Sequence, residues 1–392
     1  MTKAGTTTAA ILVWVLTGCS DGVAVVHGAP TFPDEVTHTI IATDAPITAL
    51  GATSGHIVVG TELGASMVVE VALEALAVVD ETNARTDTGA VLAIARDDDG
   101  SLLVMGGEGL FLLHGDRLLP SPASDVVDGL SVSALSAQNG ELWMATDEGP
   151  HRYGAGVLEQ WDVDEAVARP NAIAARASTV LIAESEDLAE LDPNDASHQM
   201  IPLDAGQVHD IAVTAEGTYF VATDEGIVVR HPDGRYERHT LSDGGSGTTV
   251  TALAVDGAAV VATTSLGVVR FDGQDAVGLA PLVGAVPSAV AVDAYGHVWT
   301  GHDHDLVAHY VGAPSSYGSD VAPILVDRCA SCHDEGGSGP PIDFADPQAA
   351  IDRADTIIDR VLAGTMPPAG AIALTGEELS AIVRWYETGQ NP

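Results

Sequence analysis

The feature that most constrains the fold is a repeat of about 40 residues between positions 36 and 312. One copy, VTALAVDGAAVVATTSLGVVRFDG, begins at Val250, and another, VHDIAVTAEGTYFVATDEGIVVRHPDG, begins at Val208. In the clearest copies an alternating apolar run and a polar turn precede a β-branched run that ends in Ala-Thr or Gly-Thr. A glycine turn then leads to a third apolar run. Seven copies are recognisable, and they begin at Ile47, Val91, Val132, Asn171, Val208, Val250 and Pro287.

Three strands are legible in each copy, and the more variable remainder has room for a fourth. Four strands in about 40 residues is the size of a propeller blade. The strand-like stretch VTHTIIA, residues 36–42, precedes the first copy, and we predict that it completes the last blade and closes the ring. Closure protects the sheet edges. The repeats resemble those of sensor-type and YVTN-like β-propellers, so residues 36–312 are predicted to form an all-β seven-bladed propeller. The alternatives are a β-sandwich array, which would not hold this period, and a β-solenoid, whose rungs are usually shorter.

The charge excludes one class of partner. The chain has 56 acidic and 15 basic residues, a net charge of −41, and its only lysine is Lys3. Nucleic acid is therefore not expected to bind, because its phosphates would be repelled. The acidic residues are interpreted as a solvated surface of the kind found in proteins that work in salty surroundings.

The N-terminus is predicted to be a targeting segment. Lys3 precedes an apolar run, Ala9 to Leu16, that is too short to span a bilayer as a helix. The following LTGC resembles the bacterial lipobox, which implies a signal peptide at 1–19 and lipid attachment to Cys19. The alternative is an ordinary secreted protein in which Cys19 is incidental. Residues 20–35 carry Gly and Pro without sustained periodicity and are predicted to be a tether between the membrane and the first domain.

The pattern changes after Gly312, and residues 313–392 are predicted to form a small all-α domain. Ser319 or Asp320 is a plausible N-cap for a helix through PILVDR. A second helix is predicted over PQAAIDRADTIIDRVLAG, with Gly364 as its stop. A third follows the capping box formed by Thr375 and Glu378. A domain this small buries little apolar surface on its own, so we expect it to fold around a bound group.

The two remaining cysteines supply that centre. Cys329-Ala-Ser-Cys332-His333 has the C-x-x-C-H spacing of covalent c-type haem attachment, in which two thiols bond the haem vinyl groups and the imidazole binds iron. A thioredoxin-type redox pair is the first alternative, but it lacks a βαβ context. Half of a zinc site is the second, but residues 313–392 contain no further cysteine or histidine. We predict one haem c, with His333 as an axial ligand.

The second axial ligand follows by elimination. Met366 is the single methionine of residues 313–392, and no lysine competes with it. It lies in AGTMPPAG, where Pro367 and Pro368 stiffen the loop. Although a lone methionine often only fills a core, this setting favours axial ligation. His/Met ligation raises the reduction potential and leaves no open iron site, which suits electron transfer.

These two motifs make residues 313–392 resemble a class I monohaem cytochrome c domain. The resemblance implies covalent attachment at Cys329 and Cys332, with His333 proximal and Met366 distal. It also implies that the first and last helices pack, using Ile324 or Leu325 against Ile382 and Trp385. The domain departs from lysine-ringed relatives, because it has 12 acidic residues against four arginines. Docking to a redox partner protein through a lysine ring is therefore not expected.

Three functions remain open at this stage. The first is a membrane-tethered, extracytoplasmic electron-transfer protein whose propeller is a docking or binding module. The second is an oxidoreductase whose propeller turns over a substrate and exchanges electrons through the haem, as in quinoprotein dehydrogenases and haem d₁ nitrite reductases. The third is a non-redox binding or sensing lipoprotein. No catalytic residue is predicted in the propeller, and His302-Asp303-His304-Asp305 is interpreted as an exposed turn in preference to a metal site.

Overall fold

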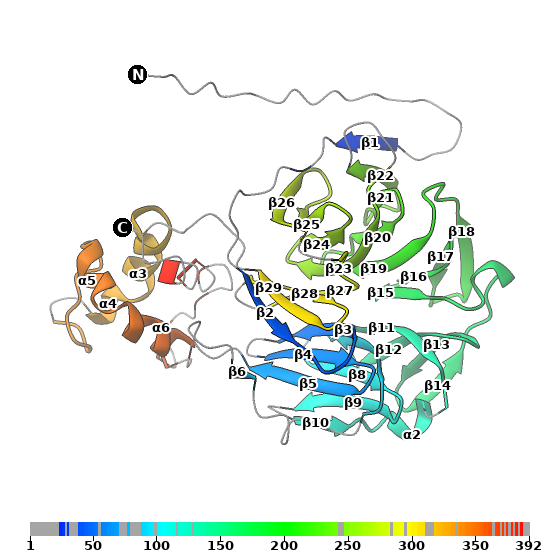
Figure 1. Ribbon diagram of the computed structural model, residues 1–392, viewed down its shortest axis with the longest axis horizontal. Coiled ribbons are helices and arrows are strands. Elements are labelled where there is room, and N and C mark those ends of the chain that lie inside the picture. The colour runs from blue at the N-terminus through cyan, green and yellow to red at the C-terminus, as the bar shows by residue number, and fades with distance from the viewer. Residues whose placement is uncertain are drawn as a thin grey trace.

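The computed structural model describes residues 23–27, 30, 38–53, 56–69, 77–78, 88–97, 100–114, 117–127, 129–138, 140–241, 247–282, 285–293, 296–309, 317–333, 336–362, 365–368, 371, 374, 378, 381–382 and 385–386. Within them, seven sheets are followed in the chain by a small helical domain (Figure 1). The predicted fold class is confirmed. None of the helices in these ranges combines the length and the apolar character that crossing a bilayer requires.

The first four blades each hold four consecutive antiparallel strands. Blade 1 contains β3 (Ile47–Ala52), β4 (His56–Thr61), β5 (Gly64–Val69) and β6 (Ala77–Val78). Blade 2 contains β7 (Val91–Arg96), β8 (Leu102–Gly106), β9 (Gly109–His114) and β10 (Arg117–Pro120), followed by the short helix α2 (Ser124–Val127). Blade 3 contains β11 (Val132–Gln138), β12 (Glu141–Thr146), β13 (Gly149–Gly154) and β14 (Val157–Gln160), followed by the 3₁₀ turn η1 (Glu165–Val167). Blade 4 contains β15 (Ala172–Arg176), β16 (Thr179–Glu184), β17 (Asp187–Asp192) and β18 (Ser197–Ile201).

The last three blades use both ends of the propeller sequence. Blade 5 contains β19 (Val208–Val213), β20 (Tyr219–Thr223), β21 (Gly226–Arg230) and β22 (Tyr236–Leu241). Blade 6 contains β23 (Val250–Asp256), β24 (Ala259–Thr264), β25 (Gly267–Phe271) and β26 (Ala276–Pro281). Blade 7 contains β27 (Ala289–Val292), β28 (Val298–His302), β29 (Asp305–His309) and, as its outer strand, β2 (His38–Ala42).

The ring closes as the sequence predicts. Strand β2 pairs antiparallel with β29, with Ile40 opposite Val307, so a strand from before the first blade completes the last one. The first strands of neighbouring blades contact one another all the way round, including β27 with β3. A hydrophobic cluster crosses the same closure, where Trp299 and Leu306 of blade 7 pack with Ile57 of blade 1. Closure therefore rests on backbone pairing and on core packing together.

The threonine that ends the second strand in several copies has a definite role. In four blades its Oγ1 donates a hydrogen bond to the carbonyl oxygen of the glycine three residues later, at 2.7–3.0 Å. Each of these glycines has a positive φ of 111–145°, a region that side chains make costly. The repeated Thr-x-x-Gly signature is thus the hairpin between the second and third strands. The pairs are Thr61 with Gly64, Thr146 with Gly149, Thr223 with Gly226, and Thr264 with Gly267.

A second recurring polar contact joins neighbouring blades. A hydroxyl or amide near the start of one blade donates to the backbone carbonyl where the next inner strand begins. Because both groups would otherwise be desolvated without a partner, each bond supports the ring. The bonds run from Thr48 to Val91 (2.7 Å), from Ser133 to Pro170 (2.7 Å), from Asn171 to Val208 (2.9 Å) and from Thr251 to Pro287 (2.7 Å).

One strand lies where the sequence suggests only a tether. Val23–His27 forms β1, which pairs parallel with the outer strand β22 of blade 5, with Val25 opposite His239. Blade 5 is therefore a five-stranded sheet in the order β1-β22-β21-β20-β19. The tether prediction for 20–35 needs this correction: part of the segment adds to a sheet edge. An exposed edge strand offers unpaired backbone groups, and an apolar run such as VAVVH can satisfy them.

The helical domain differs from its prediction in two details. The first helix, α3 (Ala322–Arg328), is preceded by the π-helical turn η2 (Tyr317–Val321), and no side chain caps it. Ser319 and Asp320 are therefore not N-caps; burial of Tyr317 and Val321 decides how the chain enters the helix. The second predicted helix is divided into α5 (Pro347–Ile351) and α6 (Ala354–Leu362). Gly364 and Thr375 lie outside the described residues.

Candidate functional site

The CASCH segment forms one tight turn of helix after α3. Cys329 ends α3, and α4 (Ala330–His333) follows at once. The backbone N–H groups of Cys332 and His333 both donate to the Cys329 carbonyl oxygen, each at 3.1 Å. Residues three apart on a helix lie on the same face, so the turn presents the two thiols side by side. Both cysteines are half-buried and neither is in a disulfide.

The environment of the first thiol keeps it protonated. Burial raises the pKa of Cys329, and the neighbouring Cys332 raises it further because two thiolates would repel each other. A thiolate pair of the thioredoxin kind needs the opposite shift. The electrostatics of this turn therefore favour the haem-attachment interpretation over the redox-pair alternative.

His333 has its ring fixed by one hydrogen bond. Its Nδ1 atom lies 2.8 Å from the carbonyl oxygen of Pro340. A carbonyl oxygen can only accept, so Nδ1 carries the proton and the Nε2 lone pair is left for a metal. A backbone partner of this kind orients an imidazole ligand and raises its basicity. A ring held in this way can bind a metal through Nε2.

The chain after His333 folds back closely over the CASCH turn. The N–H of Gly339 donates to the Cys332 carbonyl at 2.8 Å, and that of Ile342 donates to the His333 carbonyl at 2.7 Å. A Cβ placed on Gly339 would lie 2.8 Å from Cε1 and 2.9 Å from Nδ1 of His333. The Phe344 ring meets the imidazole edge-on, with centroids 6.0 Å apart. Glycine at 339 is thus required for this close approach.

A compact core holds the CASCH turn against the rest of the domain. Leu325 of α3 packs in one cluster with Ile382 and Trp385, and Ile324 lies against it, so the predicted contact of first and last helices is confirmed. The Tyr317 ring packs at a tilt of 49° against Trp385, with centroids 5.3 Å apart, and its hydroxyl donates to the Phe344 carbonyl at 2.7 Å. Burial raises the pKa of Tyr317 to about 12, so this hydroxyl remains a donor at physiological pH.

An ion pair adds a polar link between the same two segments. Arg328, directly before the first cysteine, places Nε 3.0 Å and an Nη atom 2.7 Å from one carboxylate oxygen of Glu378. The hydrogen bond to Glu378 raises the pKa of Arg328. In the sequence Glu378 is predicted only to complete a capping box, whereas its contact with Arg328, 50 residues away, is tertiary.

Met366 stands at the end of α6 with its side chain outward. Its N–H and that of Thr365 both donate to the Arg360 carbonyl, at 3.1 and 3.0 Å, which closes the helix. The Met366 side chain is 38% exposed, and Val326 of α3 is 48% exposed. The half-buried thiols of Cys329 and Cys332 and the Nε2 lone pair of His333 are the donors that a haem c requires, and the exposed thioether of Met366 is available as a further one.

The propeller histidines do not assemble a metal site within the described residues. His302 ends β28 with Nδ1 2.6 Å from the Ala285 carbonyl oxygen and Nε2 3.1 Å from Thr300 Oγ1. His304 lies beyond it in an exposed turn that begins at Asp303, whose φ is positive. Across the described ranges no three His, Cys, Asp or Glu side chains group as metal ligands. The exposed turn is therefore shorter than predicted: it consists of Asp303 and His304, while His302 is buried at the end of β28 and Asp305 begins β29.

Two supports of the site escaped sequence reasoning. Pro340 and Gly339 act through their backbone atoms. Neither has a polar side chain from which a role at the site could be predicted. The glycine-rich run GGSGPP, residues 336–341, directly after the CASCH motif was the available signal. Glycine in such a run often marks a close backbone approach.

Comparison with protein-family models finds one domain. Residues 319–385 match the family described as cytochrome C oxidase, cbb3-type, subunit III. A search of curated proteins found no match. The family match covers the whole CASCH turn, the Gly339 loop, Met366 and Trp385. Such a domain implies covalently bound haem c and haem-based electron transfer.

Comparison with solved structures identifies the other part of the chain. The extracellular domain of the hybrid two component system BT4673 from B. thetaiotaomicron is 14% identical, with a TM-score of 0.54 over 71% of this chain and 40% of that one. This chain therefore spans less than half the length of that structure. Streptogramin B lyase is 13% identical, with a TM-score of 0.52 over 71% and 98%. Virginiamycin B lyase from Staphylococcus aureus is 10% identical, with a TM-score of 0.51 over 70% and 99%.

Identities this low show a shared fold and carry no activity across. The match in fold agrees with the seven sheets of residues 38–309, and the family match agrees with the site built around Cys329, Cys332 and His333. The chain is a seven-bladed β-propeller followed, at residues 319–385, by a cytochrome c domain.

Proposed function

We propose that this protein is a membrane-tethered, extracytoplasmic electron-transfer protein. Its C-terminal domain carries one haem c, and its propeller serves as a docking or binding module. The observation that supports this most strongly is the hydrogen bond from His333 Nδ1 to the Pro340 carbonyl, which leaves Nε2 available directly after a C-x-x-C pair. When bound there, the haem iron supplies one-electron redox chemistry.

The chain's own residues would hold and tune that group. Cys329 and Cys332 would anchor it through two thioethers, and the helical turn that joins them sets the spacing. His333 is proposed as the proximal ligand and Met366 as the distal one. A thioether opposite an imidazole stabilises the reduced state and raises the potential. Phe344 and the buried core around Leu325 would exclude water from the proximal side.

The cellular setting belongs to the same proposal. Covalent haem attachment and the N-terminal segment together favour a location outside the cytoplasm. Cys19 of the LTGC motif is proposed as the lipidated residue, and the resulting protein would be held to the envelope membrane. The acidic surface of the helical domain favours a redox partner that docks through a basic face.

An absorption spectrum taken before and after dithionite tests the electron-transfer proposal. The holoprotein should show the bands of a single six-coordinate c-type haem that reduces fully, and the haem should stay with the denatured chain. Additional quinone or haem d₁ bands, or reduction of the haem by a substrate, would favour the oxidoreductase alternative. A colourless protein whose two thiols remain open to alkylation would contradict the proposal.

Membrane attachment needs a separate test. Cys19→Ser should release the protein from the membrane fraction without loss of haem colour, because residue 19 lies far in sequence from the haem site. Retention of the variant in the membrane fraction would reject the lipid anchor and leave the haem assignment untouched.

A further inference from the structure

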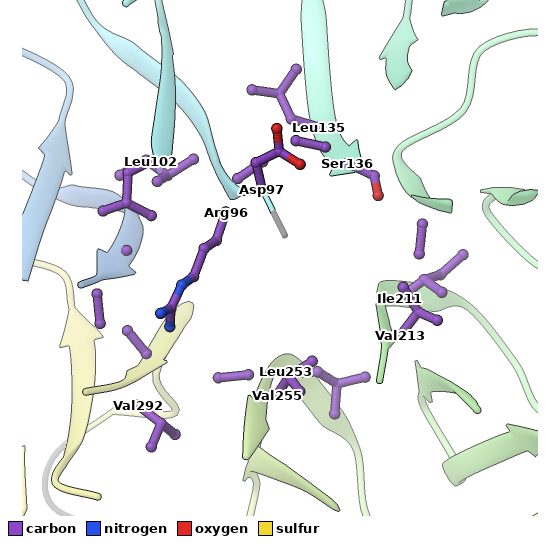
Figure 2. Close-up of a pocket in the computed structure, with 18 of the residues that line it drawn as sticks. Arg96, Asp97, Leu102, Leu135, Ser136, Ile211, Val213, Leu253, Val255 and Val292 are labelled. Carbon is purple, nitrogen blue, oxygen red and sulfur yellow. The ribbon is translucent and has the colours of Figure 1, made fainter. Parts of the chain in front are cut away.

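Blade 7 closes the propeller ring. Its outer strand β2 comes from the N-terminal side of the propeller sequence, and its other three strands come from the C-terminal side. Its inner strand β27 contacts β23 of blade 6 and β3 of blade 1. Figure 2 shows the inner strands around the central opening, with Val292 of β27 on the side that blade 7 contributes. A change that weakens blade 7 therefore acts where the two ends of the propeller sequence meet.

Histidines gather in this blade. Five of the 14 in the chain lie on its strands or in its turns, and three of these are at most 6% exposed. Histidine changes its charge near neutral pH, so the blade holds groups that respond to mild acid. One of the buried rings, His297, lies 2.9 Å from the buried carboxylate of Asp293, which can balance a positive charge. The five are His38, His297, His302, His304 and His309, of which His297, His302 and His309 are buried.

A threonine hydroxyl joins the other two buried rings. Thr300 Oγ1 lies 3.1 Å from Nε2 of His302 and 2.9 Å from Nε2 of His309. The Ala285 carbonyl lies 2.6 Å from Nδ1 of His302 and can only accept, so this Nδ1 carries the proton of the neutral ring. Nε2 of His302 then accepts from the Thr300 hydroxyl, and Nε2 of His309 donates to the same oxygen. With both rings neutral, one arrangement of protons satisfies all of these contacts.

A second proton on His302 breaks this arrangement. Its Nε2 would become a donor, and the Thr300 oxygen would face N–H groups from both rings while its own hydrogen lost its acceptor. Thr300 is completely buried, so water cannot replace that acceptor. Relief would require His309 to move its proton from Nε2 to Nδ1, so one added proton disturbs both rings. The two histidines therefore titrate as a coupled pair.

The face of the blade that carries this pair is packed against blade 6. Val298, Thr300 and His302 alternate along β28 and so share one face, and His309 lies opposite Val298 in register. Val298 belongs to an apolar cluster between the two blades that includes Val268 of β25. The pair is thus enclosed between blades, which is a poor environment for a positive charge.

One carboxylate faces His302 from its own blade. Asp305 of β29 lies opposite His302 in register and is exposed. Burial lowers the pKa of His302, whereas the hydrogen bond to the Ala285 carbonyl and the Asp305 carboxylate act in the opposite direction. The net lowering means that the closed blade holds this ring neutral at pH values where an exposed histidine, with a pKa of about 6.5, already binds a proton. Acid therefore favours forms in which the ring is exposed.

The remaining charged groups around the pair are few. Asp256 of β23 and Arg270 of β25 lie on the same side of blade 6 as the apolar cluster, and they pair with each other at 2.6 Å. His38 of β2, opposite His309 in the backbone register, is a further titratable residue of this sheet. The paired arginine and aspartate cancel each other, and a further histidine cannot balance a positive charge.

We propose that blade 7 is a pH-sensitive latch, in which protonation of His302 and His309 in mild acid releases β2 and opens the ring. The closed blade binds these protons less tightly than the open one, so the latch is fully stable above about pH 6.5 and weakens as the pH falls through that value. Strand β2 is the element released, because it is the outer strand and is held in its sheet by β29 alone. This latch goes beyond the haem-based function and does not depend on it.

Hydrogen exchange of the holoprotein, followed by mass spectrometry at pH 7.5 and pH 5.0, tests the latch. After correction for the intrinsic exchange rate, the amides of β2 should lose protection roughly tenfold at pH 5.0, because an exposed histidine is then almost fully charged. The outer strand β10 of blade 2, whose register partner His114 is exposed, should keep its protection. Equal loss at β2 and β10, or no loss at β2, would overturn the proposal.

Replacement of both rings should remove the response. In the double variant His302→Gln with His309→Gln, β2 should be equally protected at the two pH values, because neither position can become charged. His198→Gln, at an exposed position of the outer strand β18, is the matched control and should keep the wild-type response. A response of β2 to pH that survives in the double variant would contradict the latch.

Asp305→Asn covers the case in which the double variant does not fold. The residue is exposed, so the fold should tolerate the change. Loss of its carboxylate disfavours a charge on His302 in the closed blade, so β2 should lose roughly twofold more protection than the wild type at pH 5.0 and no more at pH 7.5. Equal or greater protection at pH 5.0 would also reject the latch. The haem spectrum should be the same in every variant, which separates this result from a failure of the haem assignment.

Discussion

His333 and Gly339 approach each other so closely that a single methyl group would collide with the imidazole. An added Cβ at residue 339 would lie 2.8 Å from the ring, while the same loop supplies the Pro340 carbonyl that orients Nδ1. The backbone of this loop therefore fixes the orientation of the His333 ring. It sets the direction of the Nε2 lone pair as firmly as a side-chain partner would.

Gly339→Ala should consequently disturb the haem site more than the addition of one methyl group usually would. The methyl group must push the ring or the loop away, at a cost of roughly 1–3 kcal/mol, and the lost Nδ1 hydrogen bond should lower the basicity of the ligand. We expect a shifted reduction potential and a lowered melting temperature of the helical domain, measured by redox titration and by circular dichroism.

Gly318→Ala is the matched control for that experiment. A Cβ on Gly318 meets no atom within 4 Å, although the residue lies in the same domain. Its potential and stability should equal those of the wild type. Equal behaviour of the two alanine variants would show that the close approach to His333 has no consequence.

Met366→Ala should remove the second axial ligand and leave haem attachment intact. The oxidised wild-type protein is expected to show the weak near-red band of sulfur-to-iron ligation, and the variant should lack it. The reduction potential should fall, because loss of the thioether destabilises the reduced state. Met200→Ala, on the outer strand β18 of blade 4, should change neither property. A near-red band that survives in Met366→Ala would contradict the assignment.

Glu378→Gln should loosen the helical domain without changing the ligands. The substitution breaks the ion pair with Arg328, whose side chain is only 18% exposed. The expected effect is a small fall in the melting temperature, of a few degrees at most, and a weaker dependence of stability on salt. Asp327→Asn removes a longer contact of 3.4 Å to the same arginine from a carboxylate that is 71% exposed, and it should have less effect. The reverse order would contradict the role given to Glu378.

Asp210 should make the stability of the propeller depend on pH. Its carboxylate accepts hydrogen bonds from Ile211 N–H and from Leu253 N–H of the next blade, each at 2.8 Å, and burial raises its pKa to about 6. The folded protein then binds this proton more tightly than the unfolded chain, whose aspartate pKa is about 3.9. The stabilisation is complete below about pH 4 and is lost as the pH rises through 6.

Denaturant unfolding between pH 4 and 7 measures this effect. Relative to Asp210→Asn, the free energy of unfolding of the wild type should fall by roughly 1–3 kcal/mol over that window. Asp275→Asn, at an exposed turn of blade 6, should follow the wild type across the range. A wild type and Asp210→Asn that change in parallel with pH would disprove the prediction.

The features readable from the sequence are those encoded locally. Alternating apolar runs and polar or glycine turns repeat about every 40 residues, and in four blades they include a Thr-x-x-Gly hairpin such as Thr223 to Gly226. The seven blades and their closing strand could therefore be predicted. The C-x-x-C-H turn is equally local. By contrast, β1 forms because it pairs with the edge strand β22, about 200 residues later, and no local signal near Val23 predicts it. The Arg328–Glu378 pair and the Pro340 contact likewise depend on how distant segments meet.

The entry into α3 shows how tertiary burial overrides a local signal. Ser319 and Asp320 have the side chains of N-caps, yet Ser319 donates instead to the Asp320 carboxylate at 2.9 Å. Tyr317 and Val321 are completely buried on either side of them. Burying an aromatic ring and a valine outweighs one capping bond of about 1 kcal/mol. Sequence rules for helix ends therefore fail where a neighbouring residue anchors the core.

The pairing of β1 with β22 has a consequence for how the propeller would stand above a bilayer. Only three residues separate Cys19 from Val23, the first residue of β1. The four extended Cα steps from Cys19 to Val23 span about 14 Å at most. A lipid on Cys19 would therefore hold the outer edge of blade 5 close to the lipid headgroups. The propeller would then be attached through one edge, and β1 would restrict its orientation to the lipid surface. A flexible sixteen-residue tether, as predicted for residues 20–35, would have let it rotate freely.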